Sequence, residues 1–148
     1  MKAIHVRQYK CHSSEFWWLM ISGIGKISDF IRVCFGKRPN VVTSGVASSG
    51  PKAIQRAGDL QPDLILLHVG LAGMNGIQVA ERIRQLVPNT KIIFLTVESD
   101  PEIVRDAFRA GGEGYILKWD AANELAMGME TVLFRKRFTS RGIGEIAD

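Results

Sequence analysis

The chain has 148 residues, enough for one domain with a buried core. With 46% hydrophobic and 23% charged residues, its composition is that of an ordinary soluble globular protein. Two cysteines, Cys11 and Cys34, are too few for a disulfide framework or a zinc site. The longest apolar run, Phe16–Ile21, is far shorter than the roughly 20 residues of a membrane-spanning helix. We therefore expect a cytoplasmic protein without membrane association.

The net charge of +4 is distributed unevenly along the chain. Residues 1–60 carry nine lysine or arginine residues and three acidic ones, whereas residues 61–148 carry ten and twelve. A basic surface of this kind is either a solvated face or a nucleic-acid site. Because no cluster of bases is interleaved with aromatic residues for stacking, a solvated face is the simpler interpretation. Nucleic acid is therefore not an expected partner.

The first third of the chain gives weak structural signals. Residues 1–15 read as a poorly ordered N-terminal extension. Two apolar stretches, Phe16–Ile21 and the pair Val41-Val42, indicate strands. Apolar residues at helical spacing predict a helix from Ser22 or Lys26 to Gly36, and a second helix is predicted from Ala53 to Leu60.

From Asp63 onward the pattern is regular. Apolar runs bounded by turn residues predict strands buried on both faces, and apolar residues at helical spacing predict helices between them. Asp100 followed by Pro101 is a strong helix start. The predicted order is a strand at Leu64–Val69, a glycine-rich turn at Gly70–Gly76, a helix at Ile77–Val87, a strand at Lys91–Val97, a helix from Asp100 to Gly111, a strand at Gly114–Lys118, a helix at Ala121–Phe134 and a fraying tail from Arg135 to Asp148.

Strands and helices that alternate with short connections predict an α/β fold with a parallel sheet and helices on both faces. In such sheets ligands bind beyond the carboxyl ends of the strands. Three polar side chains stand at those ends: His68, Thr96 and Lys118. We expect them to converge on one rim.

Two stretches carry a resemblance to a known family. The run from Pro62 to Leu67 precedes His68, and the glycine-rich turn contains Gly70, Gly73, Met74, Asn75 and Gly76. Together they closely resemble the receiver domains of bacterial two-component response regulators, over residues 53–138. The resemblance implies a flavodoxin-like, doubly wound sheet of five parallel strands. It divides the chain into an extension (1–15), a receiver-like domain (16–138, degenerate over 16–52) and a tail (139–148).

In that family an aspartate at the end of the third strand accepts a phosphoryl group from a histidine kinase. Mg²⁺, held by this aspartate and an acidic pair after the first strand, neutralises charge in the transfer. The resemblance further implies that Thr96 is the switch residue, Tyr115 the switch aromatic and Lys118 the lysine that contacts the phosphoryl oxygens.

The chain departs from the family at the position of the aspartate, where it has His68. No two adjacent acids occur before Asp63, so the Mg²⁺ ligands are missing and we expect neither cofactor nor enzyme activity. His68 is expected to form a hydrogen bond with a neighbour. Ala72 replaces the usual proline. Lys118 has lost its counter-charge and is expected to reach solvent or pair with Asp120.

The codons offer an explanation for the missing acidic pair. If Phe16–Ile21 is read after dropping the first two bases of the first codon, the shifted frame gives Leu-Val-Val-Asp-Asp or Leu-Val-Ala-Asp-Asp, provided that Leu19 is encoded with a final G. This is the start expected of a receiver. We hypothesise that residues 16–52 are a frameshifted translation that returns to frame near Ala53. Genomic DNA read in all three frames tests this hypothesis.

Three functions remain open from the sequence. The first is a receiver-like signalling module that is not phosphorylated and binds a histidine kinase, another signalling protein or a second copy of itself. The second is a decayed receiver without activity. The third is a small basic nucleic-acid-binding domain, which ranks last because no recognition helix is visible.

Overall fold

The computed structural model describes residues 2–6, 17–22, 42–47, 49–70 and 74–144. The helices are α2 (Gly50–Leu60), α3 (Gly76–Leu86), α4 (Pro101–Arg109), α5 (Ala121–Leu133) and the short 3-10 helix η1 (Arg141–Ile143). The strands are β1 (Lys2–Val6), β2 (Trp17–Ser22), β3 (Val42–Val46), β4 (Leu64–Leu67), β5 (Lys91–Thr96), β6 (Gly114–Leu117) and β7 (Phe138–Thr139). The helix predicted between residues 22 and 36 lies outside the described residues.

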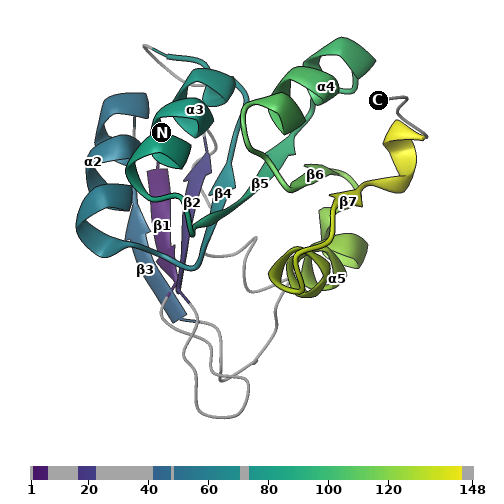
Figure 1. The fold of residues 1–148 in the computed structure, drawn as a ribbon. Coiled ribbons are helices and arrows are strands. Elements are labelled where there is room, and N and C mark those ends of the chain that lie inside the picture. The colour runs from purple at the N-terminus through teal and green to yellow at the C-terminus, as the bar shows by residue number, and fades with distance from the viewer. Residues whose placement is uncertain (1, 7–16, 23–41, 48, 71–73, 145–148) are drawn as a thin grey trace.

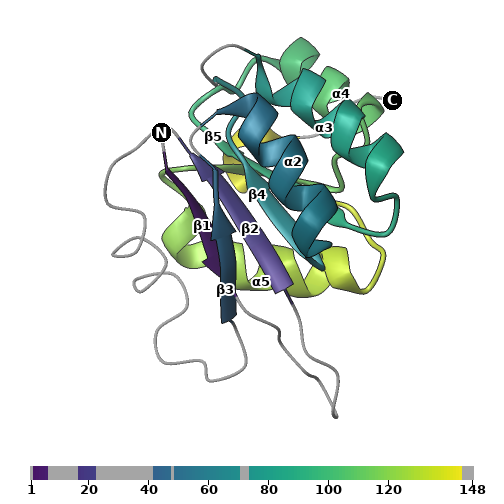
Figure 2. The ribbon, with the colours of Figure 1, turned by 90° about the vertical axis from the view of Figure 1, so that its left-hand side faces the viewer.

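The described strands form one sheet in the order β1-β3-β2-β4-β5-β6-β7, with β1 also paired to β2 (Figure 1). Strands β2, β4, β5, β6 and β7 run parallel. Helices α2, α3 and α4 lie on one face and α5 on the other (Figures 1 and 2). The α/β fold with a parallel sheet and helices on both faces is confirmed. Within the described part of the chain, no helix has the length and apolarity needed to cross a bilayer.

The central strands carry continuous apolar runs because both of their faces are covered. Leu64 and Leu66 of β4 pack with α5, whereas Ile65 and Leu67 pack with the helices on the opposite face. All four side chains are fully buried. The continuous apolar run of the sequence therefore predicted this strand correctly, since a strand with one solvated face would alternate.

The helix starts follow from capping side chains. The Asn75 side chain accepts from the Gln78 amide at 2.9 Å, and the Gln78 side chain accepts from the Asn75 amide at 3.2 Å, which makes a reciprocal capping box for α3. Asp100 accepts from the Glu102 amide at 2.8 Å and caps α4 as predicted. Ser49 caps α2, which therefore begins at Gly50 and not at Ala53.

Two strands correct the prediction of a five-stranded, wholly parallel sheet. Lys2–Val6, predicted to be a poorly ordered extension, is strand β1 and pairs antiparallel with β2. Phe138–Thr139, assigned to a fraying tail, is strand β7 and pairs parallel with β6. A sheet edge carries unpaired amide and carbonyl groups, and short segments near it in space satisfy them whatever their distance in sequence. The local periodicity of the sequence cannot predict such strand pairs.

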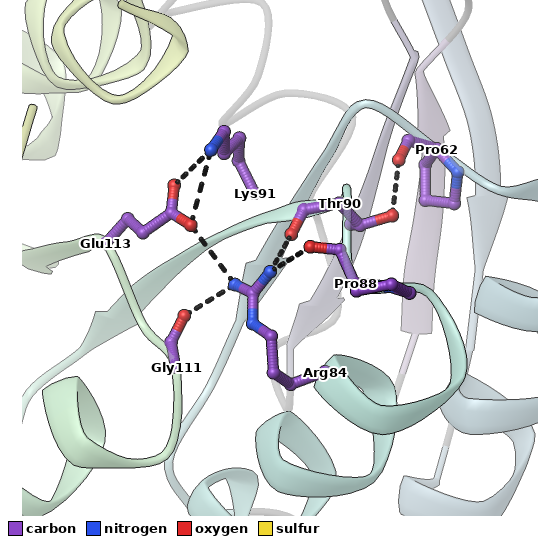
Figure 3. Close-up of polar contacts among 7 residues, drawn as sticks. All are labelled: Pro62, Arg84, Pro88, Thr90, Lys91, Gly111 and Glu113. Carbon is purple, nitrogen blue, oxygen red and sulfur yellow. Dashed lines mark hydrogen bonds and ion pairs between the residues drawn. The ribbon is translucent and has the colours of Figure 1, made fainter. Parts of the chain in front are cut away.

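Arg84 joins the two connections at the amino-terminal ends of β5 and β6 (Figure 3). Its Nη1 donates to the carbonyl oxygens of Pro88 and Thr90 at 2.7 and 2.9 Å. Its Nη2 donates to the carbonyl oxygen of Gly111 at 2.6 Å and lies 3.3 Å from a carboxylate oxygen of Glu113. One guanidinium thus fixes the α3–β5 and α4–β6 connections, at the end of the sheet opposite the carboxyl ends of the strands.

Candidate functional site

The carboxyl ends of β4, β5 and β6 bring three polar residues to one edge of the sheet. His68 directly follows β4, Thr96 is the last residue of β5, and Lys118 directly follows β6. The Lys118 amide donates to the Thr96 carbonyl oxygen at 2.9 Å, so β5 and β6 stay paired up to the rim. The structure therefore places these residues as parallel strand ends require.

His68 is a half-buried imidazole held by the backbone that follows it. Its Nδ1 accepts a hydrogen bond from the Gly70 amide at 2.9 Å. Burial, and secondarily the nearby charge of Lys118, hold the pKa of His68 below its usual 6.5. A hydrogen bond that an imidazole donates raises its pKa, whereas one that it accepts lowers it. Here Nδ1 is the acceptor, so the bond exists only while Nδ1 is unprotonated, and it also favours the neutral ring.

This environment predicts a stability that rises with pH. Because the folded pKa of His68 is lowered, the unfolded chain binds more protons between that pKa and 6.5. The contribution of His68 is complete above about pH 6.5 and is lost as the pH falls through the folded pKa. Urea unfolding should therefore give a lower free energy at pH 5.5 than at pH 7.5. We expect His68→Gln, which does not titrate, to have a smaller difference, and an equal difference in both proteins would contradict the assignment to His68.

Lys118 corrects an expectation from the sequence. It neither reaches solvent with its amine nor pairs with Asp120, whose Oδ2 lies 2.8 Å from the Ser140 hydroxyl. Among the described residues, Lys118 Nζ is buried and has no hydrogen-bond partner. Burial lowers the pKa of Lys118 accordingly. The rim thus holds an amine and an imidazole, and within the described part of the chain no carboxylate is bound to either.

Thr96 and Tyr115 are both fully buried, and both form a hydrogen bond with the backbone of Glu98. The Glu98 amide donates to Thr96 Oγ1 at 3.3 Å, and the Tyr115 hydroxyl donates to the Glu98 carbonyl oxygen at 2.8 Å. Burial first, and then the carboxylates of Glu98 and Asp100, raise the pKa of Tyr115 well above its usual range. Glu98 could not be predicted as a partner of these side chains, because both hydrogen bonds are made by its backbone.

The loop between β4 and α3 contains the remaining predicted site residues. Gly70 is exposed, and Asn75 caps α3. Met74 packs against the hydrophobic core beside Gly50 at the start of α2. Gly76 is buried where α3 meets the end of β4, and its amide donates to the Val69 carbonyl oxygen at 2.6 Å. Residues 71–73, which include Gly73 and Ala72, lie outside the described residues.

The site does not have the chemistry of a magnesium centre. Mg²⁺ requires oxygen ligands at octahedral geometry, usually one or two carboxylates with water. At the rim the structure places an imidazole and an amine, and no group of three His, Cys, Asp or Glu side chains within the described residues is arranged to hold a metal ion. The residues described here do not fit the ion.

The sequence profile of the response regulator receiver domain family matches residues 26–129, and the chain belongs to this family. It is 36% identical over 80 residues to the nitrate/nitrite response regulator protein NarL of Escherichia coli K12, covering 54% of this chain and 37% of NarL. It is 32% identical over 101 residues to the response regulator protein VraR of Staphylococcus saprophyticus, covering 68% of this chain and 46% of VraR. The chain thus spans less than half the length of these relatives.

Solved structures agree on the fold. A LuxR-family two-component response regulator from Aurantimonas sp. SI85-9A1 superimposes with a TM-score of 0.79 at 24% identity, covering 86% of this chain and 91% of that one. The RcsB response regulator of Salmonella typhimurium, whose structure concerns DNA interaction, gives 0.75 at 20% identity, covering 84% and 62%. The expectation that nucleic acid is not a partner gains no support from relatives of this kind.

Proposed function

We propose that this chain is a receiver module of two-component signalling that binds protein partners, such as a histidine kinase, without being switched by phosphate. The observation that carries the proposal is the buried Tyr115 ring, whose hydroxyl donates to the Glu98 carbonyl oxygen at 2.8 Å. In receivers this aromatic moves when the domain is phosphorylated. Here a hydrogen bond and full burial hold it in place in the unmodified chain.

The chemistry at His68 supports the first half of the proposal. We place His68 at the phosphoacceptor position because it follows the central strand β4 and precedes the loop that leads to α3. A neutral imidazole supplies no carboxylate to form an acyl phosphate or to bind Mg²⁺. One ring nitrogen, Nδ1, is already occupied by the Gly70 amide.

The geometry around Glu98 supports the second half. Thr96 and Tyr115 bind the amide and the carbonyl of one residue in the β5–α4 connection, so this connection has one defined position. Val97 of this connection is 51% exposed, and Trp119, in the β6–α5 connection at the same end of the sheet, is 60% exposed. A surface with a fixed backbone and an exposed aromatic is suited to recognition by another protein.

Treatment with acetyl phosphate and Mg²⁺ tests the proposal. We expect intact-mass spectrometry to find no phosphorylated species of the full chain, because neither the carboxylate nor the metal ligands are present. A receiver that carries the aspartate, treated in parallel, is the positive control. Stable phosphate on any residue of the rim, including phosphohistidine at His68, would contradict the proposal.

The alternative of a decayed receiver is tested separately. In the described core, β4, β5 and β6 all contribute fully buried side chains, and this favours a folded product. A module that binds partners should unfold in one cooperative transition upon heating. A broad, non-cooperative melt of the full chain would favour the decayed receiver.

A further inference from the structure

The segment Arg137–Ile143, which we call the C-terminal strap, is bound to three elements of the receiver. Its backbone pairs with β6: the Phe138 amide donates to the Glu113 carbonyl oxygen at 3.0 Å and the Ser140 amide to that of Tyr115 at 2.9 Å. The Arg137 guanidinium lies 5.1 Å from the centre of the Phe108 ring on α4. The strap therefore covers the edge of the sheet beside β6 (Figure 1).

The third attachment is polar and joins the strap to α5. The buried Ser140 Oγ lies 2.8 Å from Asp120 Oδ2 and 2.6 Å from Glu124 Oε2, and the Arg141 amide donates to Glu124 Oε1 at 3.2 Å. A hydroxyl carries one proton, so Ser140 donates to only one of the two carboxyl groups at a time. The strap is thus held by a few bonds and a two-residue strand, which places it among the parts of a protein that open below the global unfolding free energy.

Tyr115 connects the strap to the surface proposed above for partner binding. Its carbonyl oxygen accepts from the Ser140 amide of the strap, and its hydroxyl donates to the Glu98 carbonyl oxygen of the β5–α4 connection. A shift of Tyr115 therefore alters both bonds. Asp120, the carboxylate that contacts Ser140, also follows two residues after Lys118 of the rim.

We propose that the C-terminal strap is coupled to the surface at Glu98 through Tyr115, so that loosening either one loosens the other. This rests on the proposed function, in which that surface binds a partner. The strap then transmits the state of the surface to the C-terminal end of the receiver. This transmission does not require phosphorylation. Binding that holds the β5–α4 connection would tighten the strap, and displacement of Tyr115 would release it.

Native-state hydrogen exchange on two variants of the full chain tests the coupling. Tyr115→Phe keeps the ring and removes the hydroxyl bond to Glu98; we expect exchange of the Ser140 and Phe138 amides to accelerate about fivefold or more. Ser140→Ala removes the strap hydroxyl and should accelerate exchange of the Glu98 amide. Because coupling is reciprocal, the double variant should lower the opening free energy of these amides by less than the sum of the two single variants. Rates are normalised to the Leu66 amide in the core, so that a global loss of stability does not imitate the effect.

Thr131→Ala is the matched control. It deletes a hydroxyl of α5 that donates to the Met127 carbonyl oxygen within the same helix, and should leave both sets of amides unchanged. Glu124→Gln, which retains an acceptor for Ser140, should have a smaller effect than Ser140→Ala. The coupling is refuted if each variant accelerates exchange only beside its own substitution.

The titration of Tyr115 separates this result from a failure of the proposed function. The difference between the ultraviolet titrations of the wild type and Tyr115→Phe reports this phenol alone. If Tyr115 ionises in the usual range, the ring is not buried and the proposed function fails as well. If it resists ionisation while exchange shows no reciprocity, only the coupling of the strap is wrong.

Discussion

Replacing Arg84 with methionine should lower the free energy of unfolding by about 3 kcal/mol. The substitution removes the donors of three backbone carbonyl groups, at Pro88, Thr90 and Gly111, and one partner of the Glu113 carboxylate. Hydrogen bonds from a charged donor contribute more than neutral ones, and carbonyl groups that stay partly buried lose their partners. The side chains of Arg84 and Glu113 are each 26% exposed, so water replaces part of the loss.

Urea unfolding at neutral pH measures this effect, and the chain offers a matched control. Arg109→Met removes an arginine that pairs with Asp106 at 3.4 Å, with side chains 75% and 58% exposed. We expect a change below about 0.5 kcal/mol for this exposed pair. Arg84→Lys should remain destabilised by about 2 kcal/mol, because a single ammonium cannot reproduce the planar guanidinium fork. If Arg84→Met is as mild as Arg109→Met, the two connections do not depend on the guanidinium.

Most of the fold beyond Asp63 could be predicted from the sequence, because there the local signals agree with one another. The apolar runs predicted β4, β5 and β6, and the Asp100-Pro101 pair predicted the start of α4. In these elements only the ends differ from the prediction: β5 stops at Thr96, since Val97 is half exposed and has left the sheet. The strand β7, in contrast, was not predicted. Before Asp63 the same reasoning found two strands approximately, but it missed β1, whose pairing is antiparallel and whose apolar residues form no distinctive pattern.

In the site, the positions of the side chains could be predicted from the sequence, but their hydrogen-bond partners could not. Placement of His68, Thr96 and Lys118 at one edge follows from parallel topology alone, so the sequence predicted it. The hydrogen-bond partners of the site residues could not be predicted from topology, since they are backbone groups or residues distant in sequence. Glu98 contributes its backbone amide and carbonyl, and Asp120 forms a hydrogen bond with Ser140, which belongs to a segment predicted to fray. No local sequence pattern distinguishes Arg84 from the other polar residues of its helix, because its four partners come from two later connections.

The two glycines on either side of the β4–α3 loop should respond very differently to alanine. A Cβ added at Gly76 would overlap the His68 carbonyl oxygen and lie 2.9 Å from Val69 Cα, and both are backbone atoms that cannot rotate away. We expect Gly76→Ala to cost about 3 kcal/mol, at the upper end for overpacking, because α3 must move away from β4. A Cβ at Gly70 would lie 3.5 Å from the nearest atom of the His68 ring, an ordinary contact, and Gly70 is not among the positive-φ glycines.

Gly70→Ala should therefore stay within about 0.5 kcal/mol of the wild type, as expected for an exposed position without strain. Thermal and urea unfolding of the two variants, measured side by side, test the contrast. The comparison also probes the site, because the atoms that would clash with Gly76→Ala belong to the backbone of His68 and Val69. A large loss for Gly76 alone would mean that the helix and the strand end form one rigid unit that fixes His68. Equal and small losses would mean that α3 can retreat from β4, and the His68 position would then not be determined by this packing.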